Sequence, residues 1–480
     1  MALKLPHIAR NSAIYVVFNV LQRAINFFLL PLYTIYLTPE DYGITNVLIS
    51  VSALLTFLFT LSLQSASARF HYKYIRDKQL CKKIWGSNYL FIIFSSFFWV
   101  LIVCLSYKYT LRYLIGDDIP FYPYALIGIL NCAFSPIYLY FQTYLQTTQQ
   151  AKFFVINNLA FFLCQLFLTI FMVVFLQWKA LGVILSQLIV NTIFGIYAII
   201  ALRKHIIYSF SAKILKKSLR YSVPLIPHNL SGWLNGMLDR IFINKIINLA
   251  SVGLYSIAFQ FGSLINLITM GVNQAFTPFF FSNHTTEAGR NKILKVTDFG
   301  ILCITVIGLI ISLFSQEILV IMTDSKYHTI WPSIIILVAA NLYDCIYKFH
   351  VAVLFLEKTK ELSFISISCA ILTCVLNYIL ISNIGYIGAA ISFLIVQFMT
   401  SVVVTVYAKK LRPDIKYNTL LHFFEISMAM IISIIVIVIS QDLPIIAKIL
   451  LKSLSFFAIV FMIILLNRKS LSNLKQRKYE

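Results

Sequence analysis

The chain has 480 residues, of which 60% are hydrophobic and only 12% are charged. Soluble domains are roughly 45–50% apolar and about 25% charged, so this composition excludes a soluble globular protein and indicates an integral membrane protein. A formal charge of +22 would suit a nucleic-acid-binding protein, but the basic residues lie in short loops between apolar segments, which is the pattern of membrane topology. We therefore expect no nucleic-acid partner.

The apolar segments predict an all-α integral membrane protein with about fourteen transmembrane helices. Each segment is a continuous run of about 20 residues, the length that a helix needs to cross a bilayer, whereas membrane β-barrels show alternating segments of about ten residues. The first segment follows Lys4 and Arg10 without a small-residue cleavage site, which indicates an uncleaved span rather than a signal peptide. The predicted spans are residues 11–37, 43–66, 84–107, 119–143, 153–177, 180–202, 217–247, 251–276, 298–322, 331–356, 362–382, 385–408, 418–440 and 444–466.

Lys and Arg are distributed unequally between the two sets of loops that these spans would leave. Most of the 39 basic residues lie at the chain ends and in the loops on one side, with dense clusters in residues 69–83 and 203–220. An excess of Lys and Arg marks cytoplasmic loops, so both termini are predicted to be cytoplasmic. The two clusters are also expected to contact anionic membrane lipids.

The chain also resembles itself when it is shifted by 210 residues. This shift aligns identical residues in four places: Ser12 with Ser222, Asn19 with Asn229, Gly43 with Gly253, and Gln64 with Gln274. The matches predict two six-helix bundles, residues 1–210 and 211–410, followed by two extra helices and a basic tail in 411–480. Because six is even, both bundles would enter the membrane from the same side, and in such parallel repeats the substrate sites lie between the halves near the midplane.

Polar residues occur at helical spacing inside the first and seventh predicted spans. Asn19, Arg23 and Asn26 share one face of the first span, where an arginine costs roughly 2.5–3.5 kcal/mol on insertion scales. In the seventh span, His228, Gly232, Asn235 and Asp239 share one face, and Asn229, Trp233, Gly236 and Arg240 form the next stripe. A lipid-facing helix would not carry these side chains, so they are expected to face a bundle interior or a water-filled cavity.

Each of these residues also has a structural interpretation. Asp239 and Arg240 are neighbours that point about 100° apart on a helix, so Asp239 would pair with a cation elsewhere, for which Arg23 is a candidate. His228 and the asparagines could simply form hydrogen bonds between helices.

The tenth, thirteenth and fourteenth spans carry further polar residues. Asn341, Asp344 and Lys348 share one face of the tenth span, and Asp344 and Lys348, four residues apart, could neutralise each other or serve a substrate. Glu425 lies near the start of the thirteenth span. Lys452, in the last span, is expected to extend its ammonium to the membrane surface.

Sequence motifs of catalysis are missing. There is no P-loop and no Rossmann glycine pattern, no nucleophile elbow, and the eight cysteines lack metal-ligand spacing. We therefore expect a protein that is not an enzyme and holds no metal.

Three short stretches carry a resemblance to a known family. They are YSVPLIPH (residues 221–228) followed by Asp239 and Arg240, LTPEDYG (residues 37–43), and LEKTK (residues 356–360). Together with the length and the fourteen-span plan, they resemble the polysaccharide repeat-unit flippases, often called Wzx proteins, of the polysaccharide transporter family. That family belongs to the multidrug/oligosaccharidyl-lipid/polysaccharide exporter superfamily, which also contains multidrug antiporters of the MATE type. The loop at 147–152 lacks a glycine that the family often has there.

The resemblance implies a function. Such proteins move undecaprenyl-diphosphate-linked oligosaccharide repeat units, used for O-antigen or a similar envelope polysaccharide, from the cytoplasmic to the periplasmic leaflet of the bacterial inner membrane. It implies alternating access, allows for coupling to H⁺ or Na⁺ without any other cofactor, and allows for partnership with a polysaccharide polymerase and a chain-length regulator. A diphosphate cannot cross hydrocarbon unaided, and cationic side chains suit its oxygens.

This function suggests a role for each polar residue inside the spans. The diphosphate would be attracted by Arg23, Arg240 and Lys348. The path of the sugars would be lined by Asn19, Asn26, His228, Asn229, Asn235 and Asn341. The cations, or the coupling ion, would be held by Asp239, Asp344 and Glu425.

Other functions remain open at this point. A peptidoglycan-lipid flippase or a multidrug antiporter of the same superfamily would share much of the plan. A membrane glycosyltransferase or polymerase is a more distant alternative, because it would need acidic catalytic groups facing one side of the membrane.

Overall fold

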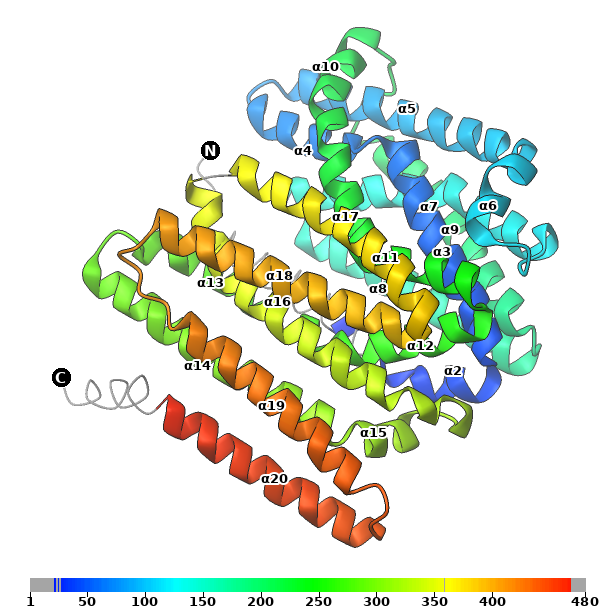
Figure 1. Ribbon diagram of the computed structural model, residues 1–480. Coiled ribbons are helices and arrows are strands. Elements are labelled where there is room, and N and C mark those ends of the chain that lie inside the picture. The colour runs from blue at the N-terminus through cyan, green and yellow to red at the C-terminus, as the bar shows by residue number, and fades with distance from the viewer. Residues whose placement is uncertain (1–20, 23–24, 26, 358, 468–480) are drawn as a thin grey trace. The chain divides into compact units, whose positions relative to one another are not determined.

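The computed structural model describes residues 21–22, 25, 27–357 and 359–467 (Figure 1). These residues fold into helices joined by short loops, and no strand occurs among them. Their internal contacts divide the chain into two compact units, Met1–Gly253 and Leu254–Glu480, which are called unit 1 and unit 2 below. The predicted bundles 1–210 and 211–410 follow an internal repeat rather than contacts, so that division stays a prediction.

Unit 1 is built on long helices that pack around aromatic side chains. Its core gathers Trp85 and Tyr89 from one helix, Tyr140 and Tyr144 from a second, and Phe194 from a third. The ring centroids of Tyr89 and Tyr140 lie 5.1 Å apart in a stacked arrangement, which adds specific geometry to apolar burial. The helices of this unit are α2 (Leu30–Tyr36), α3 (Pro39–Thr60), α4 (Leu63–Lys73), α5 (Lys78–Leu105), α6 (Leu111–Ile115), α7 (Leu126–Thr147), α8 (Ala151–Ile170), α9 (Lys179–Leu202), α10 (Ala212–Ser222) and α11 (Ile226–Ile246).

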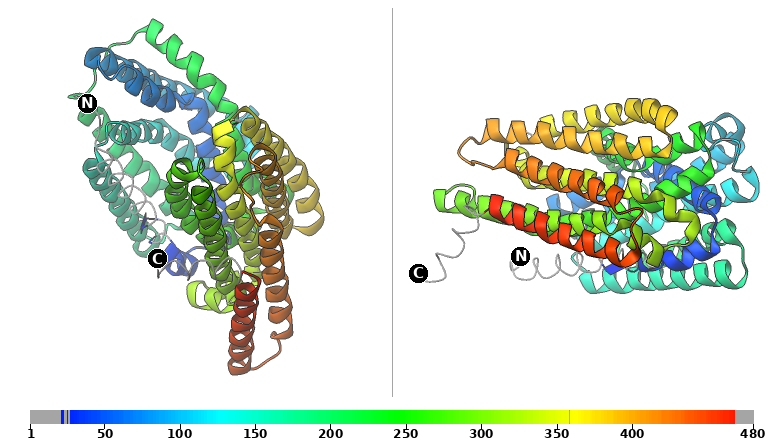
Figure 2. Two further views of the ribbon diagram at one scale, coloured as in Figure 1. Left: turned by 90° about the vertical axis from the view of Figure 1, so that its left-hand side faces the viewer. Right: turned by 60° about the horizontal axis from the view of Figure 1, so that its bottom comes forward.

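Unit 2 is organised around one buried helix, α16. Within the span Ser325–Leu356, which contains this helix, 78% of an 18-residue apolar stretch is buried, compared with 17% of such a stretch in the last helix, α20. Helices α13, α14, α18 and α19 pack against α16, and α19 and α20 lie side by side in both figures (Figures 1 and 2). The helices are α13 (Leu264–Asn283), α14 (Glu287–Leu313), α15 (Ser315–Met322), α16 (Trp331–Glu357), α17 (Thr359–Ile384), α18 (Tyr386–Leu411), α19 (Thr419–Ile439) and α20 (Ile445–Leu466); α12 (Leu249–Gly262) joins the two units.

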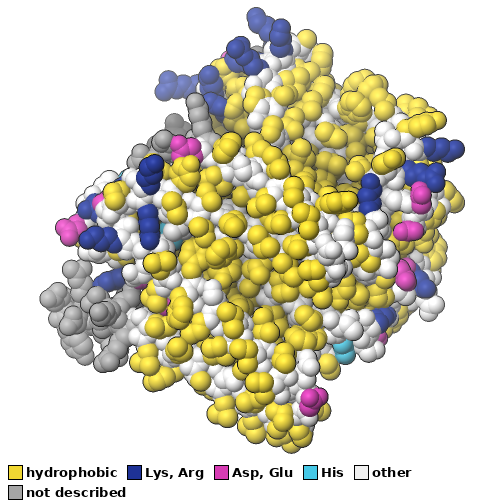
Figure 3. All heavy atoms as spheres, viewed as in Figure 1, with side chains coloured by type: hydrophobic (Ala, Val, Ile, Leu, Met, Phe, Trp, Pro, Cys, Tyr) yellow, Lys and Arg dark blue, Asp and Glu magenta, His cyan; other side chains and the backbone are white. Residues whose placement is uncertain are grey.

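The outward faces of the helices are suited to lipid. Figure 3 shows hydrophobic side chains covering the visible face of unit 2, with Lys and Arg gathered at the edges of the view. Exposed Ile, Leu and Phe side chains on α19 and α20 include Ile435, Ile446 and Phe457, which are 49%, 76% and 68% accessible. Large apolar surface of this extent marks contact with a membrane rather than water.

Twelve helices in the described part of the chain are long and apolar enough to cross a membrane. The protein is therefore a multi-pass membrane protein, as the sequence predicts. About half of the first predicted span, 11–37, lies outside the described residues. The seventh predicted span, 217–247, begins in the exposed basic helix α10. The rest of this span is α11, which is less apolar because it carries the polar residues named above. The count of fourteen stays a prediction.

Besides 217–247, three predicted spans are wrong as single helices, and one of them, 298–322, is divided between α14 and α15 at Phe314. The predicted span 43–66 is divided after α3, because Leu61 and Ser62 adopt left-handed φ angles of 46° and 56°, which a right-handed helix cannot continue. The predicted span 251–276 is divided between α12 and α13 at Ser263. The Ser263 hydroxyl donates to the Gln260 carbonyl oxygen at 2.9 Å, a local bond that competes with the helical pattern.

Candidate functional site

Lys348 is the centre of a polar cluster inside unit 2. Its ammonium lies 2.7 Å from the Asp344 carboxylate, one turn earlier on α16. It also donates to Thr269 Oγ1 at 3.0 Å and to Asn266 Oδ1, both on α13. The Lys348 and Asp344 side chains keep 15% and 12% exposure. Asp344 and Lys348 are therefore paired with each other. The Lys348 ammonium has hydrogen-bond partners but remains partly exposed to a ligand.

Asn341 lies two turns before Lys348 on the same helix. It is buried, and its amide group donates to the Leu337 carbonyl oxygen at 2.7 Å. Its side-chain oxygen has no hydrogen-bond partner among the described residues. A buried acceptor without a partner is costly, so this oxygen is available for a ligand or a water molecule.

Helix α11 in unit 1 carries most of the residues predicted for the seventh span. Asn229 donates to Ser62 Oγ at 2.9 Å, and Trp233 donates to the Ser50 carbonyl oxygen at 2.9 Å. These two hydrogen bonds connect α11 to α3 and to the turn at Leu61 and Ser62 that follows it. These contacts support the structural interpretation for Asn229. Asn235 is half-buried, and the side chain of His228 lies outside the described residues.

Asp239 and Arg240 are both buried, with 1% and 7% exposure. Arg240 Nη1 donates to the Gly236 carbonyl oxygen at 2.6 Å, one turn earlier on α11. The proposed pairing of Asp239 with Arg23 concerns a residue outside the described part of the chain, as do the roles predicted for Asn19 and Asn26, so these stay predictions.

A cavity that the sequence analysis did not predict lies in unit 1. Its volume is about 290 Å³, and it is lined by Gln22, Tyr33, Phe161, Gln165, Gln187 and Asn191. Gln165 donates to Ser186 Oγ at 2.9 Å, and Asn191 donates to Asn131 Oδ1 at 2.9 Å. The cavity thus presents amide groups beside aromatic rings. Gln165 is flanked by apolar residues, so its sequence gives no sign of the cavity. Gln187 and Asn191 are four residues apart, and this spacing could have predicted that they share a helix face.

Glu425 belongs to a buried polar group at the start of α19. It is fully buried, accepts a hydrogen bond from Asn467 at the end of α20, and its second oxygen has no partner among the described residues. One turn earlier, His422 Nε2 lies 2.9 Å from Asp298 Oδ1 of α14. Glu425 thus contacts an amide in this group, whereas the sequence analysis proposed that it holds a cation or the coupling ion.

The expectation that Lys452 reaches the membrane surface is wrong. Its side chain is 0% exposed, and its ammonium lies 2.7 and 2.8 Å from the two carboxylate oxygens of Glu317 on α15. The placement of α20 in unit 2 brings the lysine to an acid on another helix, which sequence spacing alone does not indicate. This ion pair is internal to the unit.

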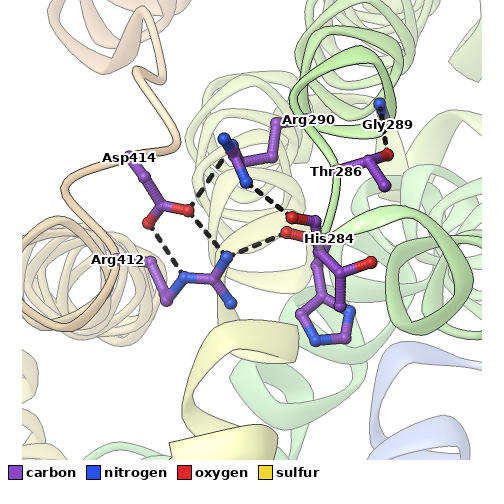
Figure 4. A network of polar contacts seen from close by, with 7 residues as sticks. His284, Thr286, Gly289, Arg290, Arg412 and Asp414 are labelled. Carbon is purple, nitrogen blue, oxygen red and sulfur yellow. Dashed lines mark hydrogen bonds and ion pairs between the residues drawn. The ribbon is translucent and has the colours of Figure 1, made fainter.

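Two arginines share one acid at the end of unit 2 that contains the α13–α14 and α18–α19 loops. Arg412 binds Asp414 through both carboxylate oxygens, at 2.9 and 2.7 Å, and donates to the His284 carbonyl oxygen at 2.9 Å (Figure 4). Arg290 lies 3.5 Å from the same carboxylate. The network fastens the α18–α19 loop to the end of α13 and the start of α14. No group of acids, histidines or cysteines suited to a metal ion occurs among the described residues.

The apolar helices and the polar groups buried between them define a multi-pass membrane protein. The profile of the family described as polysaccharide biosynthesis protein matches residues 8–284, which is more than half of the chain, so the chain belongs to this family.

Two proteins of Haemophilus influenzae (strain ATCC 51907 / DSM 11121 / KW20 / Rd) are similar in sequence. The Lsg locus putative protein 1 is 26% identical over 335 residues, which cover 66% of this chain and 77% of the relative. An uncharacterized membrane protein is 23% identical over 407 residues, which cover 79% of this chain and 92% of the relative.

Solved structures share the fold. The lipid II flippase MurJ, in an inward closed conformation, has a TM-score of 0.69 at 15% identity, and the match covers 96% of this chain and 99% of MurJ. A multidrug resistance MATE family transporter of the MOP superfamily, in an inward-facing conformation, has a TM-score of 0.63 at 14% identity, with 83% and 94% coverage. The protein therefore shares its fold with these two structures.

Proposed function

We propose that this protein is a flippase that moves undecaprenyl-diphosphate-linked oligosaccharide repeat units from the cytoplasmic to the periplasmic leaflet of the bacterial inner membrane. The product would be O-antigen or a similar envelope polysaccharide, and the protein would work by alternating access. Membership in the polysaccharide biosynthesis family and a fold shared with flippases and exporters support this proposal.

The observation that carries the proposal is the state of Lys348. An ammonium group within a membrane-spanning helix is costly, and Asp344, Asn266 and Thr269 hold this one in place. The Lys348 side chain remains 15% exposed. A diphosphate could therefore replace Asp344 as the partner of the Lys348 ammonium without complete burial of the diphosphate or the ammonium. We assign Arg240 a similar role in unit 1, and Arg23, Asn19 and Asn26 remain proposed parts of the site.

We assign sugar recognition to the amide cavity and Asn235 in unit 1 and, separately, to Asn341 in unit 2. Amide groups can both donate to and accept from hydroxyl groups, and the Phe161 and Tyr33 rings offer flat apolar faces. With a volume of about 290 Å³, the cavity is at the lower end of the roughly 300–1,000 Å³ of drug-sized ligand sites. It would therefore accept a small part of the oligosaccharide rather than a whole repeat unit.

Ion coupling is a separate part of the proposal. Asp239, Asp344 and Glu425 are acids within the membrane that could take up H⁺ or Na⁺, and the unpartnered oxygen of buried Glu425 favours a proton there, because a buried carboxylate is costly when charged. No other cofactor is proposed. Both termini would be cytoplasmic. The expected partners are a polysaccharide polymerase and a chain-length regulator. The protein itself would not be an enzyme.

The test is replacement of Lys348 in the producing cell. Surface polysaccharide and lipid-linked intermediates would be measured at equal protein levels for Lys348→Gln, Lys348→Arg and Lys292→Gln, an exposed lysine of the same unit. We expect intermediates to accumulate with Lys348→Gln, partial activity with Lys348→Arg, and normal polymer with the control. Full activity of both Lys348→Gln and Arg240→Gln would remove the cations from the mechanism.

A second candidate is a lipid II flippase, which the match with MurJ over 96% of this chain favours. Complementation of cells depleted of their lipid II flippase would distinguish the two. Growth rescue would assign peptidoglycan lipid as the substrate, whereas failure to rescue, together with loss of surface polymer on deletion, supports the repeat-unit flippase. A multidrug antiporter would instead change resistance to drugs.

A further inference from the structure

Helix α10 presents a strongly basic face beside the start of a membrane span. Lys213, Lys216, Lys217 and Arg220 are exposed, whereas Leu215 and Ser218 on the opposite face are buried. Basic and apolar residues thus occupy different sides of the helix, as in helices that lie in a membrane interface. Figure 3 shows Lys and Arg side chains gathered over the end of unit 1 where Figure 1 labels α10 and α4.

A pocket of about 200 Å³ lies between α4, α5 and α10. Its apolar floor is formed by Phe70 of α4, Leu80 and Ile84 of α5, and Ile214 of α10, and Lys213 and Lys217 stand at its rim. Phe70 and Ile84 are buried and belong to one hydrophobic cluster, so the floor is a stable part of the fold. A pocket with an apolar floor and two cations at its rim suits an amphipathic anion.

One of the two rim cations, Lys217, is held by an aromatic neighbour. Lys217 Nζ donates to Tyr74 Oη at 2.5 Å and lies 4.8 Å from the centre of the Tyr74 ring. This hydrogen bond lowers the pKa of the Tyr74 hydroxyl below its usual range. Nearby, the Arg69 guanidinium lies 4.3 Å from the centre of the Tyr221 ring. The ammonium of Lys217 is thus held in place before any ligand arrives, which reduces the entropy lost on binding.

The surroundings add positive charge with little to offset it. Within residues 69–83 and 211–222 the acid is Asp77, and its carboxylate accepts a hydrogen bond from the Leu80 backbone N–H at 2.9 Å, as the N-cap of α5. The basic residues of the same segments are Arg69, Lys73, Arg76, Lys78, Lys82, Lys83, Lys213, Lys216, Lys217 and Arg220.

The depth of the pocket distinguishes a lipid from a soluble anion. Helix α5 is a membrane span that begins at Lys78, so Leu80 lies in its first turn and Ile84 one turn deeper. That is the level at which lipid headgroups meet the acyl chains. A free anion would gain nothing from the apolar floor, whereas the glycerol esters and first methylenes of a lipid would cover it.

We propose that this pocket binds one anionic phospholipid, with its phosphate between Lys213 and Lys217 and its glycerol region against Phe70, Leu80 and Ile84. Because α10 continues through a short 3₁₀ turn (Val223–Leu225) into α11, the lipid would fix the position at which α11 enters the membrane. The lipid site is distinct from the proposed transport site, and it does not depend on which substrate the protein moves.

The test is lipid retention by the purified full-length protein. Delipidated protein in detergent would be titrated with phosphatidylglycerol or phosphatidylcholine and the bound lipid counted by native mass spectrometry. The pocket variant is Lys213→Gln with Lys217→Gln. The matched control is Lys216→Gln with Arg220→Gln, which removes the same charge at the same spacing from the same helix but does not line the pocket.

We expect one phosphatidylglycerol to bind the unmodified protein at a concentration at which phosphatidylcholine does not. Each basic residue near an anionic headgroup contributes about a fivefold effect, so the pocket variant should bind roughly 25-fold more weakly. The control should change binding much less. Equal losses in both variants would show general charge attraction without a site, and competition by millimolar inorganic phosphate would show a phosphate site; either result would overturn the proposal. Circular dichroism at equal concentration would confirm that both variants are folded.

Discussion

Gly43 and Gly253 take part in a reciprocal contact within unit 1. A Cβ atom on Gly43 would lie 2.0 Å from the carbonyl oxygen of Leu249, and a Cβ atom on Gly253 would lie 1.9 Å from the carbonyl oxygen of Pro39. The starts of α3 and α12 therefore pack backbone against backbone, which only residues without a side chain allow. The 210-residue shift that aligns Gly43 with Gly253 also aligns Pro39 with Leu249. The two contacts are therefore equivalent, which is the mark of two-fold symmetry.

We expect Gly43→Ala and Gly253→Ala to destabilise the protein by about 1–3 kcal/mol each, because the added methyl group must displace backbone. The measurement is the thermal unfolding midpoint of the purified protein in detergent. Gly232→Ala is the control, since a Cβ there would meet no described atom within 4 Å, and its midpoint should change little. Equal midpoints for all three variants would contradict the close contact.

The buried pair of Lys452 and Glu317 should respond unequally to removal of either partner. Glu317→Gln leaves a fully buried ammonium without its counter-charge, whereas Lys452→Met leaves a carboxylate that is 24% exposed and can reach water. Breaking a buried pair costs about 3–5 kcal/mol, and we expect Glu317→Gln to approach this range and Lys452→Met to fall below it. Thermal unfolding of the two single variants and the double variant would measure the coupling. Additive effects would show that the two groups do not interact.

The Asp414 carboxylate should make stability depend on pH. Its bidentate contact with Arg412 lowers the pKa of Asp414 below its usual value. A carboxyl group with a depressed folded-state pKa stabilises the protein above its unfolded pKa, near 3.9, and this contribution is lost as the pH falls through the folded value. Because Asp414 is 37% exposed, the contribution should stay below about 1 kcal/mol.

Asp414→Asn tests this dependence. The variant should unfold at a slightly lower temperature than the unmodified protein at pH 7, and the difference should shrink as the pH falls below about 4 and vanish below the folded-state pKa of Asp414. High salt should also reduce the difference, because it screens exposed charges. A difference that is constant from pH 7 to pH 3 would assign the effect to packing instead of charge.

The amide cavity of unit 1 can be tested through Gln165. Gln165→Leu removes an amide from the cavity, and each lost hydrogen bond with a sugar hydroxyl would cost about 1 kcal/mol, so transport should fall about fivefold. Surface polysaccharide and lipid-linked intermediates at equal protein levels would report the loss. Cys164→Ala, an exposed position on the same helix, should leave both unchanged. Unaltered transport by Gln165→Leu would separate the cavity from sugar recognition.

Glu425 offers a test of proton coupling. Gln resembles a protonated carboxyl in shape, and its oxygen can still accept the hydrogen bond from Asn467. We expect Glu425→Gln to fold with unchanged stability at pH 7 but to lose any pH dependence of transport, whereas Glu425→Ala should unfold more easily because it leaves a cavity. Proton-driven flipping in vesicles would be the readout. Unchanged pH dependence in Glu425→Gln would exclude this residue as the coupling site.

Much of the architecture can be read from the sequence because membrane insertion depends on local composition. Continuous apolar runs and the placement of Lys and Arg suffice to predict a helical, multi-pass protein, since each span must satisfy its backbone within itself. Pro224 and Pro227 lie where α10 gives way to α11, because proline cannot donate a backbone hydrogen bond. The spacing of Asp344 and Lys348 by one turn was enough to propose their pairing.

Only the tertiary structure decided which helices bring their polar residues together. Lys452 meets Glu317, and Asn467 meets Glu425, across separations of 135 and 42 residues, and no local pattern encodes such partners. The amides of α8 and α9 appear as isolated polar residues until packing turns them toward one cavity. Composition determines that a segment enters the membrane, because insertion is a property of each helix, whereas the partners of a buried charge depend on how separate helices pack.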